Sequence, residues 1–137
     1  MTQEKTTIIL CTYNEENYIK NSIITLQQNI ENLELIIVDD NSSDKTRDII
    51  NELNNDKKIK LIHRKKSRGL ASAFLTGLIE SNGDRVGWID TNMTELTLKF
   101  KEMNNALNEG HDIAFLSRYV EGGQDNRKLF RSLCSKY

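Results

Sequence analysis

Long apolar runs and cysteine clusters are absent from this chain. No apolar stretch approaches the roughly 20 residues that a membrane-spanning helix needs, and the first residues, MTQEKTT, lack the apolar core of a signal peptide. The two cysteines, Cys11 and Cys134, are too few for a disulfide framework. These absences favour a protein of the reducing cytoplasm.

The size and composition fit one globular domain. The chain has 137 residues, of which 37% are hydrophobic and 28% charged, and it contains no repeat, linker or low-complexity segment. We therefore expect residues 1–137 to form a single domain.

Charge is distributed unevenly along the chain, although the net charge is only −1. Residues 1–56 carry a net charge of −7, whereas residues 57–68 (KKIKLIHRKKSR) carry seven basic residues and no acidic one. Such a run usually marks a solvated loop, but it could also contact phosphate groups or a membrane surface. We expect no nucleic-acid partner.

Short apolar segments alternate with segments of helical periodicity. The predicted strands are continuously apolar, and the segments between them place apolar residues at helical spacing, as Ile19, Ile23 and Leu26 do. This alternation predicts an α/β, doubly wound (Rossmann-like) fold, with a mostly parallel sheet and helices on both faces. The predicted strands are residues 6–12, 33–39, 59–63, 85–90 and 111–119.

Polar side chains follow four of these strands at their carboxyl ends, where open parallel sheets bind ligands. Three acidic clusters and one arginine should therefore converge on the same edge of the sheet. The residues at these ends are Thr12 to Glu15, Asp39 and Asp40, Asp90 to Asn92, and Ser117 to Tyr119.

Simpler or different uses of this edge explain the pattern less well. Helix capping accounts for Asp44 and partly for Asp40, but poorly for Asp90, because the next helix is expected to begin about five residues later. A dinucleotide site needs glycines in the first turn, and CTYNEENY has none. A receiver domain needs a lysine after the fifth strand, and a P-loop is absent. His63 and His111 are interpreted as ordinary strand residues.

Five motifs occur in order between residues 8 and 131, and together they resemble those of family 2 glycosyltransferases, which have the GT-A fold. CTYNEENYI is similar to the family's P-T-Y-N-E-x-E-N, and IIVDDNSSDKT to its V-D-D-G-S-x-D-G-T. GLASAFLTG resembles G-L-G-T-A-Y-x-x-G of the dolichyl-phosphate mannose synthase (polyprenyl-phosphate glycosyltransferase) branch. WIDTN takes the place of M-D-A-D, and LSRYVEGG that of S-G-T-R-Y-x-x-G-G.

The resemblance implies a site for a nucleoside-diphosphate sugar, linked to GDP or UDP. Asp40 matches the residue that binds the base, and Val38 lines the same pocket. Tyr13 and Glu15 match further nucleotide contacts, and Cys11 stands where the family has proline. A carboxylate can accept hydrogen bonds from the N–H groups of guanine or uracil.

The resemblance also implies a divalent metal, Mg²⁺ or Mn²⁺. Asp90 and Asn92 match the two ends of the D-x-D motif, which holds the metal against the diphosphate, and Thr94 falls at a further metal-side position. Thr91, inside the motif, is expected to contact the nucleotide sugar. Cleavage of the sugar–phosphate bond leaves growing negative charge on the diphosphate, which the metal at Asp90 and the guanidinium of Arg118 would neutralise.

The reaction that the resemblance implies is an inverting transfer of a mannose- or glucose-type hexose. The acceptor would be a polyprenyl or dolichyl phosphate, reached at the membrane surface, or another acceptor. A phosphate oxygen is already anionic near neutral pH and needs no strong general base. Arg118, Arg127 and Arg131, in the stretch that matches the acceptor loop, would hold this phosphate. A solvated terminal helix is the alternative for Arg127 and Arg131.

The sequence also departs from the family. It has no proline, the D-x-D motif becomes Asp90-Thr91-Asn92, and the chain ends at Tyr137, just past the acceptor loop, where family domains continue. We therefore expect a C-terminally short domain with weaker metal binding, since an amide replaces one carboxylate. Two functions stay open: a metal-assisted glycosyltransferase, and a non-catalytic nucleotide or nucleotide-sugar binding module with a degraded metal site.

Overall fold

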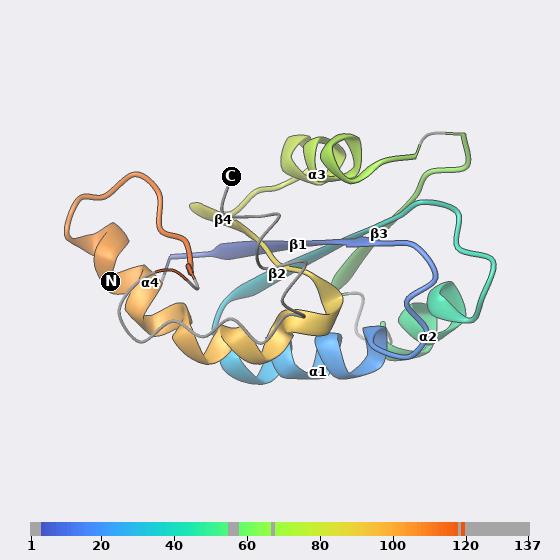
Figure 1. The fold of residues 1–137 in the computed structure, drawn as a ribbon, viewed down its shortest axis with the longest axis horizontal. Coiled ribbons are helices and arrows are strands. Elements are labelled where there is room, and N and C mark those ends of the chain that lie inside the picture. Colours follow the sequence, from blue (N-terminus) through green and yellow to red (C-terminus); the bar gives the residue numbers. More distant parts are fainter. Residues whose placement is uncertain (1–3, 55–57, 67, 118, 120–137) are drawn as a thin grey trace. The chain divides into compact units, whose positions relative to one another are not determined.

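The computed structural model describes residues 4–54, 58–66, 68–117 and 119 (Figure 1). The chain divides into two compact units, residues 1–98 and residues 99–137. The expectation of one domain over residues 1–137 stays a prediction.

The first unit is built on a four-stranded parallel sheet. Its strands are β1 (Thr6–Thr12), β2 (Leu33–Asp39), β3 (Ile59–His63) and β4 (Arg85–Trp88), in the order β3-β2-β1-β4. All neighbouring strands are parallel, and Ile9 of β1 lies opposite Ile36 of β2 on one side and Trp88 of β4 on the other. Parallel pairing brings the carboxyl ends of β1 and β2 together at one edge of the sheet.

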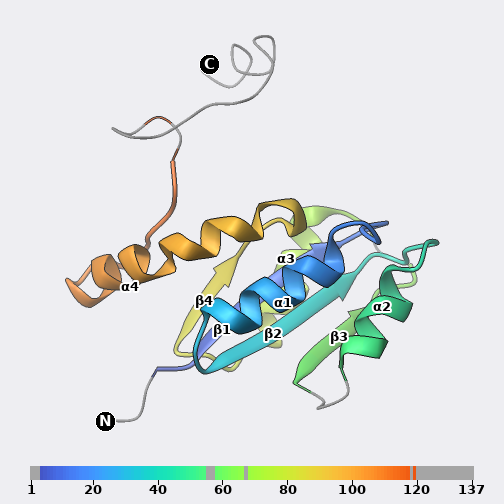
Figure 2. The ribbon, with the colours of Figure 1, turned by 90° about the horizontal axis from the view of Figure 1, so that it is seen from below.

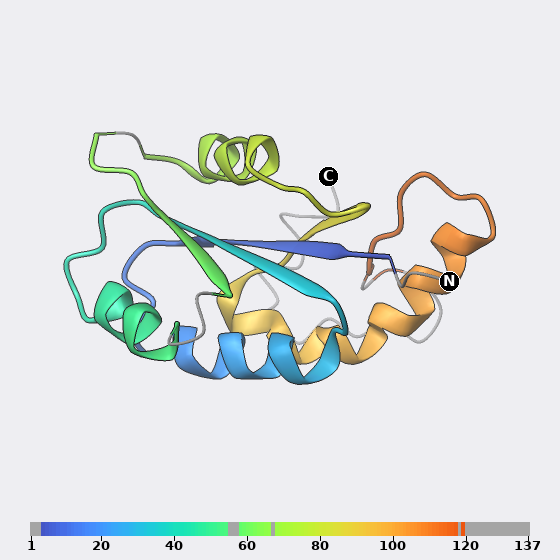
Figure 3. The same ribbon diagram turned by 180° about the vertical axis from the view of Figure 1, so that it is seen from behind.

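Helices cover both faces of this sheet. The first two, α1 (Ile19–Asn29) and α2 (Thr46–Leu53), lie on one face, and α3 (Leu70–Ile79) lies on the other, as Figures 1 and 3 show from opposite sides. Figure 2, seen from below, shows α1 lying over the central strands. The predicted α/β fold with helices on both faces is confirmed.

The core is formed by the continuous apolar runs of the central strands. Successive strand residues point to opposite faces, so a sheet that is covered on both sides buries every residue of such a run. The predicted apolar positions of α1, Ile19, Ile23 and Leu26, are also fully buried. The fully buried residues of β1 and β2 include Ile8, Ile9, Leu10, Ile36, Ile37 and Val38.

Helix α3 approaches the sheet closely because a glycine faces β1. Gly77 is buried, and a Cβ atom at this position would lie only 2.6 Å from Cγ2 of Ile9. The absence of a side chain at Gly77 therefore sets the distance between α3 and the sheet.

The segment after β4 differs from the prediction. β4 ends at Trp88, and a 3₁₀ helix, η1 (Thr91–Lys99), begins directly after Asp90 instead of about five residues later. Thr91, Thr94 and Thr97 are its buried residues, and their spacing of three matches the 3₁₀ repeat. Because this buried face is polar, it gives no apolar periodicity for the sequence to reveal.

The predicted fifth strand over residues 111–119 is wrong, because residues 111–117 and 119 form no strand. In the second unit, α4 (Phe100–Asn108) is followed by His111, whose N–H donates to the carbonyl of Ala106 (3.3 Å). Ile113 and Phe115 are 78% and 79% exposed. An apolar run becomes a strand only where its backbone can pair, and the described residues of this unit contain no strand to pair with.

Within the described ranges, no helix has both the length and the apolar character needed to cross a membrane.

Candidate functional site

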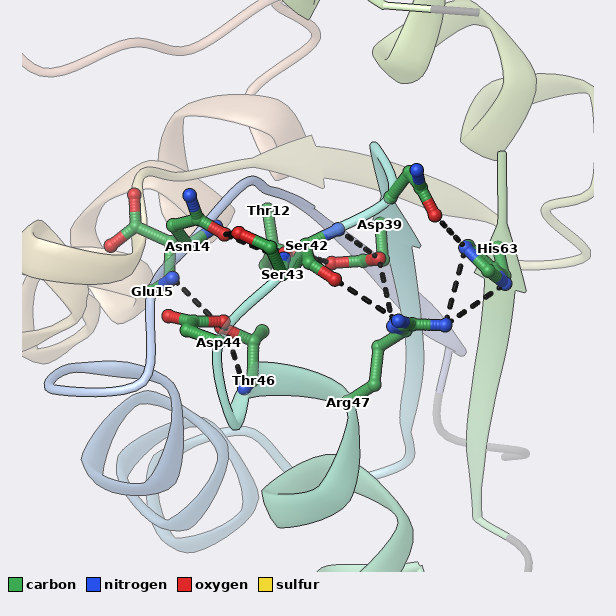
Figure 4. A network of polar contacts seen from close by, with 11 residues as sticks. Thr12, Asn14, Glu15, Asp39, Ser42, Ser43, Asp44, Thr46, Arg47 and His63 are labelled. Atoms are coloured by element: carbon green, nitrogen blue, oxygen red, sulfur yellow. Dashed lines mark hydrogen bonds and ion pairs between the residues drawn. The ribbon is translucent and has the colours of Figure 1, made fainter. Parts of the chain in front are cut away.

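The adjacent residues Asp39 and Asp40 have different surroundings at the end of β2. The side chain of Asp39 is fully buried and accepts hydrogen bonds from the hydroxyl of Thr12 (3.1 Å) and the backbone N–H of Ser42 (3.0 Å). The hydroxyl of Ser42 also donates to it, and Nε of Arg47 lies 3.7 Å away (Figure 4). All of these partners belong to the protein, so Asp39 has a structural role.

Asp39 is part of a network that joins the loops after β1 and β2 (Figure 4). The backbone N–H of Asn14 donates to the hydroxyl of Ser42 (2.9 Å), and the backbone N–H of Glu15 donates to the hydroxyl of Thr46 (2.8 Å). Asp44 accepts from the N–H of Thr46 (3.0 Å), but the N-cap position of α2 is Lys45 and no side chain caps this helix, so the predicted capping role of Asp44 is wrong. This network fixes the loop that carries Tyr13 and Glu15.

Asp40 forms a buried ion pair with Arg64. Nε of Arg64 lies 2.6 Å from Oδ1 of Asp40 and Nη2 lies 2.8 Å from Oδ2, while the backbone N–H of Gly69 donates to Oδ2 (2.8 Å). Burial alone would raise the pKa of the Asp40 carboxyl, but the hydrogen bonds from Arg64 and Gly69 and the charges of Arg64 and Arg68 lower the pKa below its ordinary value. Asp40 is therefore ionised at neutral pH.

Arg64 also holds the turn that leads into α3. Its Nη1 donates to the hydroxyl of Ser72 (3.0 Å), and its Nη2 donates to the carbonyl of Gly69 (3.2 Å). Gly69 has a φ of 120°, which favours glycine. Sequence reasoning missed Arg64, although the basic run over residues 57–68 contains it.

Five of the predicted site residues meet in one pocket of about 320 Å³ at the carboxyl ends of the strands. Of the other lining residues, the sequence had indicated only Thr12, as a residue at the end of the first strand. Arg68, which was not predicted, places its guanidinium carbon 5.0 Å from the ring centroid of Tyr13. The predicted residues are Cys11, Tyr13, Glu15, Asp40 and Asp90, and the others are Thr12, Arg68, Gly69, Leu70 and Ala73.

Cys11 contributes a half-buried thiol to this pocket. Burial and the negative charges of Asp40 and Asp90 raise the pKa of the Cys11 thiol to about 11, against the opposing effect of Arg64. Because of this pKa, the thiol is protonated near neutral pH and is a small, weakly polar group in the pocket lining.

The structure does not bring four predicted residues into the pocket lining. Val38 is fully buried in a core cluster with Ile9, Ile36 and Ala73. Thr91 and Thr94 are buried on η1, and the carbonyl of Thr91 accepts a hydrogen bond from the hydroxyl of Ser22. Asn92 is exposed, so Asn92 and Thr94 lie on different faces of η1. The predicted contacts of Arg118, Arg127 and Arg131 lie outside the described residues.

Oxygen donors for a metal are few in the pocket. Among the described residues, no group of three or more His, Cys, Asp or Glu side chains could hold a metal ion. Asp90 does line the pocket, and Asn92 follows two residues later. Mg²⁺ is commonly held by one or two carboxylates together with substrate phosphates. The residues therefore fit a divalent cation that a diphosphate helps to bind, and not a site made by the protein alone.

Comparison with known proteins agrees with this geometry. The family model described as glycosyl transferase family 2 matches residues 7–134. A dolichol-phosphate mannosyltransferase of Pyrococcus furiosus is 33% identical over 135 residues, which is 96% of this chain but 38% of that protein. The chain thus spans well under half of this relative's length.

Solved structures show the same fold. The mannosyltransferase PcManGT of Pyrobaculum calidifontis, in complex with GDP-Man and Mn²⁺, has a TM-score of 0.59 and 26% identity, over 66% of this chain and 28% of that one. TarS of S. aureus, in complex with UDP-GlcNAc, also has a TM-score of 0.59, with 23% identity over 73% of this chain and 32% of that one. Since the family model covers nearly the whole sequence, this chain belongs to glycosyl transferase family 2.

Proposed function

We propose that this chain is the nucleotide-sugar-binding part of a glycosyltransferase that moves a hexose from a GDP- or UDP-linked sugar to an acceptor. The observation that carries the proposal is the convergence of Tyr13, Glu15, Asp40 and Asp90 on one pocket at the carboxyl ends of the strands. The family membership and the relatives that were solved with nucleotide sugars support it.

The pocket offers complementary groups for a nucleoside diphosphate. Asp40 presents a carboxylate to a base, and the ring of Tyr13 provides a flat face on which a base can stack. Arg68 is the cation of the lining, so it can attract the anionic diphosphate. Binding by these groups orients the nucleotide, with its phosphates toward Asp90.

Asp90 is proposed to hold the divalent cation, Mg²⁺ or Mn²⁺, with the phosphates and with Asn92. When bound, the cation supplies Lewis-acid stabilisation of the leaving diphosphate. Asp90 keeps this positive charge at the diphosphate, and Arg118 is proposed to add a second one. Thr91 and Val38 stay proposed as nucleotide contacts and Thr94 as a metal-side residue.

The acceptor is proposed to be a polyprenyl phosphate, or a related anionic acceptor at a membrane surface, held by Arg118, Arg127 and Arg131. An ionised phosphate can attack the sugar without a strong base. This agrees with the pocket lining, which includes no histidine among the described residues. His63 instead contacts Arg47 and Asn41.

A non-catalytic binding module is the second candidate. The different burial of Asn92 and Thr94 on η1 favours it, because Asn92 is exposed whereas Thr94 is buried, and neither lines the pocket with Asp90. Such a module would keep the nucleotide pocket without the metal-assisted step.

Titration calorimetry with UDP and GDP, each with and without Mn²⁺, tests the proposal. We expect one nucleotide to bind at least about tenfold more tightly with Mn²⁺, because the cation offsets the repulsion between Asp90 and the diphosphate. Asp90→Ala should remove this gain. Asp48→Ala, which removes an exposed carboxylate of α2 that does not line the pocket, should keep it. If neither nucleotide binds in the presence of Mn²⁺, the proposed function is wrong.

A further inference from the structure

The contacts of Asp40 limit what it can offer to a ligand. An ionised carboxylate has about four positions at which it can accept a hydrogen bond. Two donors, Nη2 of Arg64 and the backbone N–H of Gly69, occupy both positions of Oδ2. Nε of Arg64 donates to Oδ1, and Nη2 of the same guanidinium also lies 2.6 Å from Oδ1. At most one acceptor position, on Oδ1, is left for a ligand.

These contacts are held in place by the surrounding structure. The side chains of Arg64 and Asp40 are only 8% and 10% exposed. Arg64 is braced from the other side by the hydroxyl of Ser72 and the carbonyl of Gly69. Freeing the second oxygen of Asp40 would break a buried ion pair and leave a charge without its partner, which is strongly unfavourable. A ligand therefore meets Asp40 as a single acceptor.

Nucleotide bases differ in the number of N–H groups at their pairing edge. Guanine presents a ring N–H and an adjacent amino group, so a carboxylate binds it well only through both oxygens. Uracil presents one ring N–H between two carbonyl oxygens, and thymine has the same edge. Adenine and cytosine have no ring N–H there. A single acceptor satisfies the donor of uracil or thymine but leaves one guanine donor unpaired, which is costly in a buried site.

The rest of the pocket suits the same edge. Arg68 lines the pocket together with Asp40, and its guanidinium carries only donors, which can serve the carbonyl oxygens of a uracil-type base. The other carboxylates of the lining are Glu15, on the loop after β1, and Asp90, directly before η1.

We propose that the pocket selects a uracil-type base over guanine, and that Arg64 is the specificity-determining residue. Arg64 does not touch the ligand. It acts as a positioning residue, by occupying both oxygens of Asp40. This inference rests on the proposed function and narrows its donor to a uridine- or thymidine-linked sugar.

The test is titration calorimetry of the chain with UDP, dTDP and GDP at one Mn²⁺ concentration. UDP or dTDP should bind at least about tenfold more tightly than GDP, the effect expected from one unpaired donor. The ratio of UDP to dTDP affinity distinguishes a uridine-linked from a thymidine-linked donor, since only UDP carries the ribose 2′-hydroxyl. Equal or tighter binding of GDP would overturn the base assignment and leave the proposed function standing. Absence of binding by all three would overturn both.

Variants test the role of Arg64 itself. Arg64→Lys keeps the positive charge but cannot occupy both oxygens of Asp40 in the same way. The preference for UDP over GDP should therefore narrow several-fold, while Lys66→Ala, an exposed position of the same basic run, should leave it unchanged. Should Arg64→Lys fail to fold, Ser72→Ala removes one brace of Arg64 and should narrow the preference in the same direction. An unchanged preference in the folded variant would refute this role.

Discussion

At the scale of single residues, the surroundings of Cys11 determine its chemistry. It lies on β1 at the pocket, where the family that the sequence resembles has proline. Its neighbours Asp40 and Asp90 are acidic, and together with burial they raise the pKa of the thiol to about 11. The thiolate is the reactive form, so a raised pKa suppresses reaction with electrophiles.

We therefore expect Cys11 to be alkylated slowly at neutral pH. In a Cys134→Ser background, which leaves Cys11 as the only thiol, iodoacetamide should react at least about tenfold more slowly than with a small free thiol. The rate should rise as the pH approaches 11. Mass spectrometry of timed samples gives the rate. A rate equal to that of glutathione at pH 7.5 would show that the thiol is not perturbed in this way.

At the scale of elements, Glu34 ties the amino end of β2 to its neighbours. Its carboxylate accepts hydrogen bonds from the hydroxyl of Thr7 on β1, the backbone N–H of Asn82 (2.7 Å) and Nζ of Lys5 (2.9 Å). Burial opposes ionisation, but these bonds prevail and lower the pKa of Glu34 to about 2, from an ordinary value of 4.5.

This lowered pKa predicts a loss of stability in acid. The Glu34 carboxyl binds a proton less readily in the folded protein than in the unfolded chain. The contribution of the ionised carboxylate to the free energy of unfolding is therefore complete above pH 4.5 and is lost as the pH falls toward about 2. Its full size is on the order of 3 kcal/mol. Glu34→Gln should lower the free energy of unfolding at pH 7 and flatten its pH dependence in this window. Glu95→Gln, at an exposed position of η1, is the matched control for urea denaturation.

The contact between α3 and β1 predicts an unusual effect of alanine. Alanine normally favours a helix over glycine by about 1 kcal/mol. At Gly77, however, the new methyl group would overlap the side chain of Ile9, which is fully buried, so that the helix or Ile9 would have to shift within the packed core. We expect Gly77→Ala to destabilise the protein by about 1–3 kcal/mol in urea denaturation. Leu75→Ala, on the exposed side of α3, should change stability much less, and a stabilised Gly77→Ala protein would contradict this packing.

Sequence patterns predicted those elements whose signals are local. Continuous apolar runs indicated β1, β2 and β3, and apolar spacing indicated α1, whose predicted positions are buried. The spacing of Leu70, Phe74 and Leu78 also indicated α3, but Leu70 and Leu78 are exposed, and the buried residues of this helix are Ala73 and Gly77. The buried threonines of η1 carry no such signal. Residues 111–117 do carry an apolar signal, but a strand also needs a paired neighbour, which no local pattern provides.

The site was predictable to a similar extent. The strand ends placed Tyr13, Asp40 and Asp90 at one edge of the sheet, where all three line the pocket, because residues at the carboxyl ends of parallel strands share one edge; their roles in binding stay predictions. The ion pair of Asp40 with Arg64 was not predictable, since the two residues are 24 positions apart and the sequence marks Arg64 only as one member of a basic run.

At the scale of the whole molecule, the balance of charge at the pocket decides between the two candidate functions. Asp90 is the one carboxylate of the altered D-x-D motif, so the nucleotide has to bring most of the charge that holds a cation. Metal binding and nucleotide binding should therefore be coupled, and each should be weak without the other.

Replacing Asn92 by aspartate changes this balance with almost no change in side-chain size. In a working transferase the new carboxylate faces a divalent cation, so its attraction to the cation should exceed its repulsion of the diphosphate. Asn92 is exposed, so η1 should tolerate the change. We expect Asn92→Asp to tighten Mn²⁺ binding to the nucleotide complex at least about threefold, a modest part of the attraction between close charges at a protein surface. Any measurable sugar transfer should also become faster.

The control is Asn51→Asp, which adds the same charge at an exposed position of α2, outside the pocket lining. It should neither tighten Mn²⁺ binding nor speed sugar transfer. If calorimetry instead gives weaker nucleotide binding by Asn92→Asp in the presence of Mn²⁺, position 92 does not face the cation, and the binding module without catalysis becomes the better description.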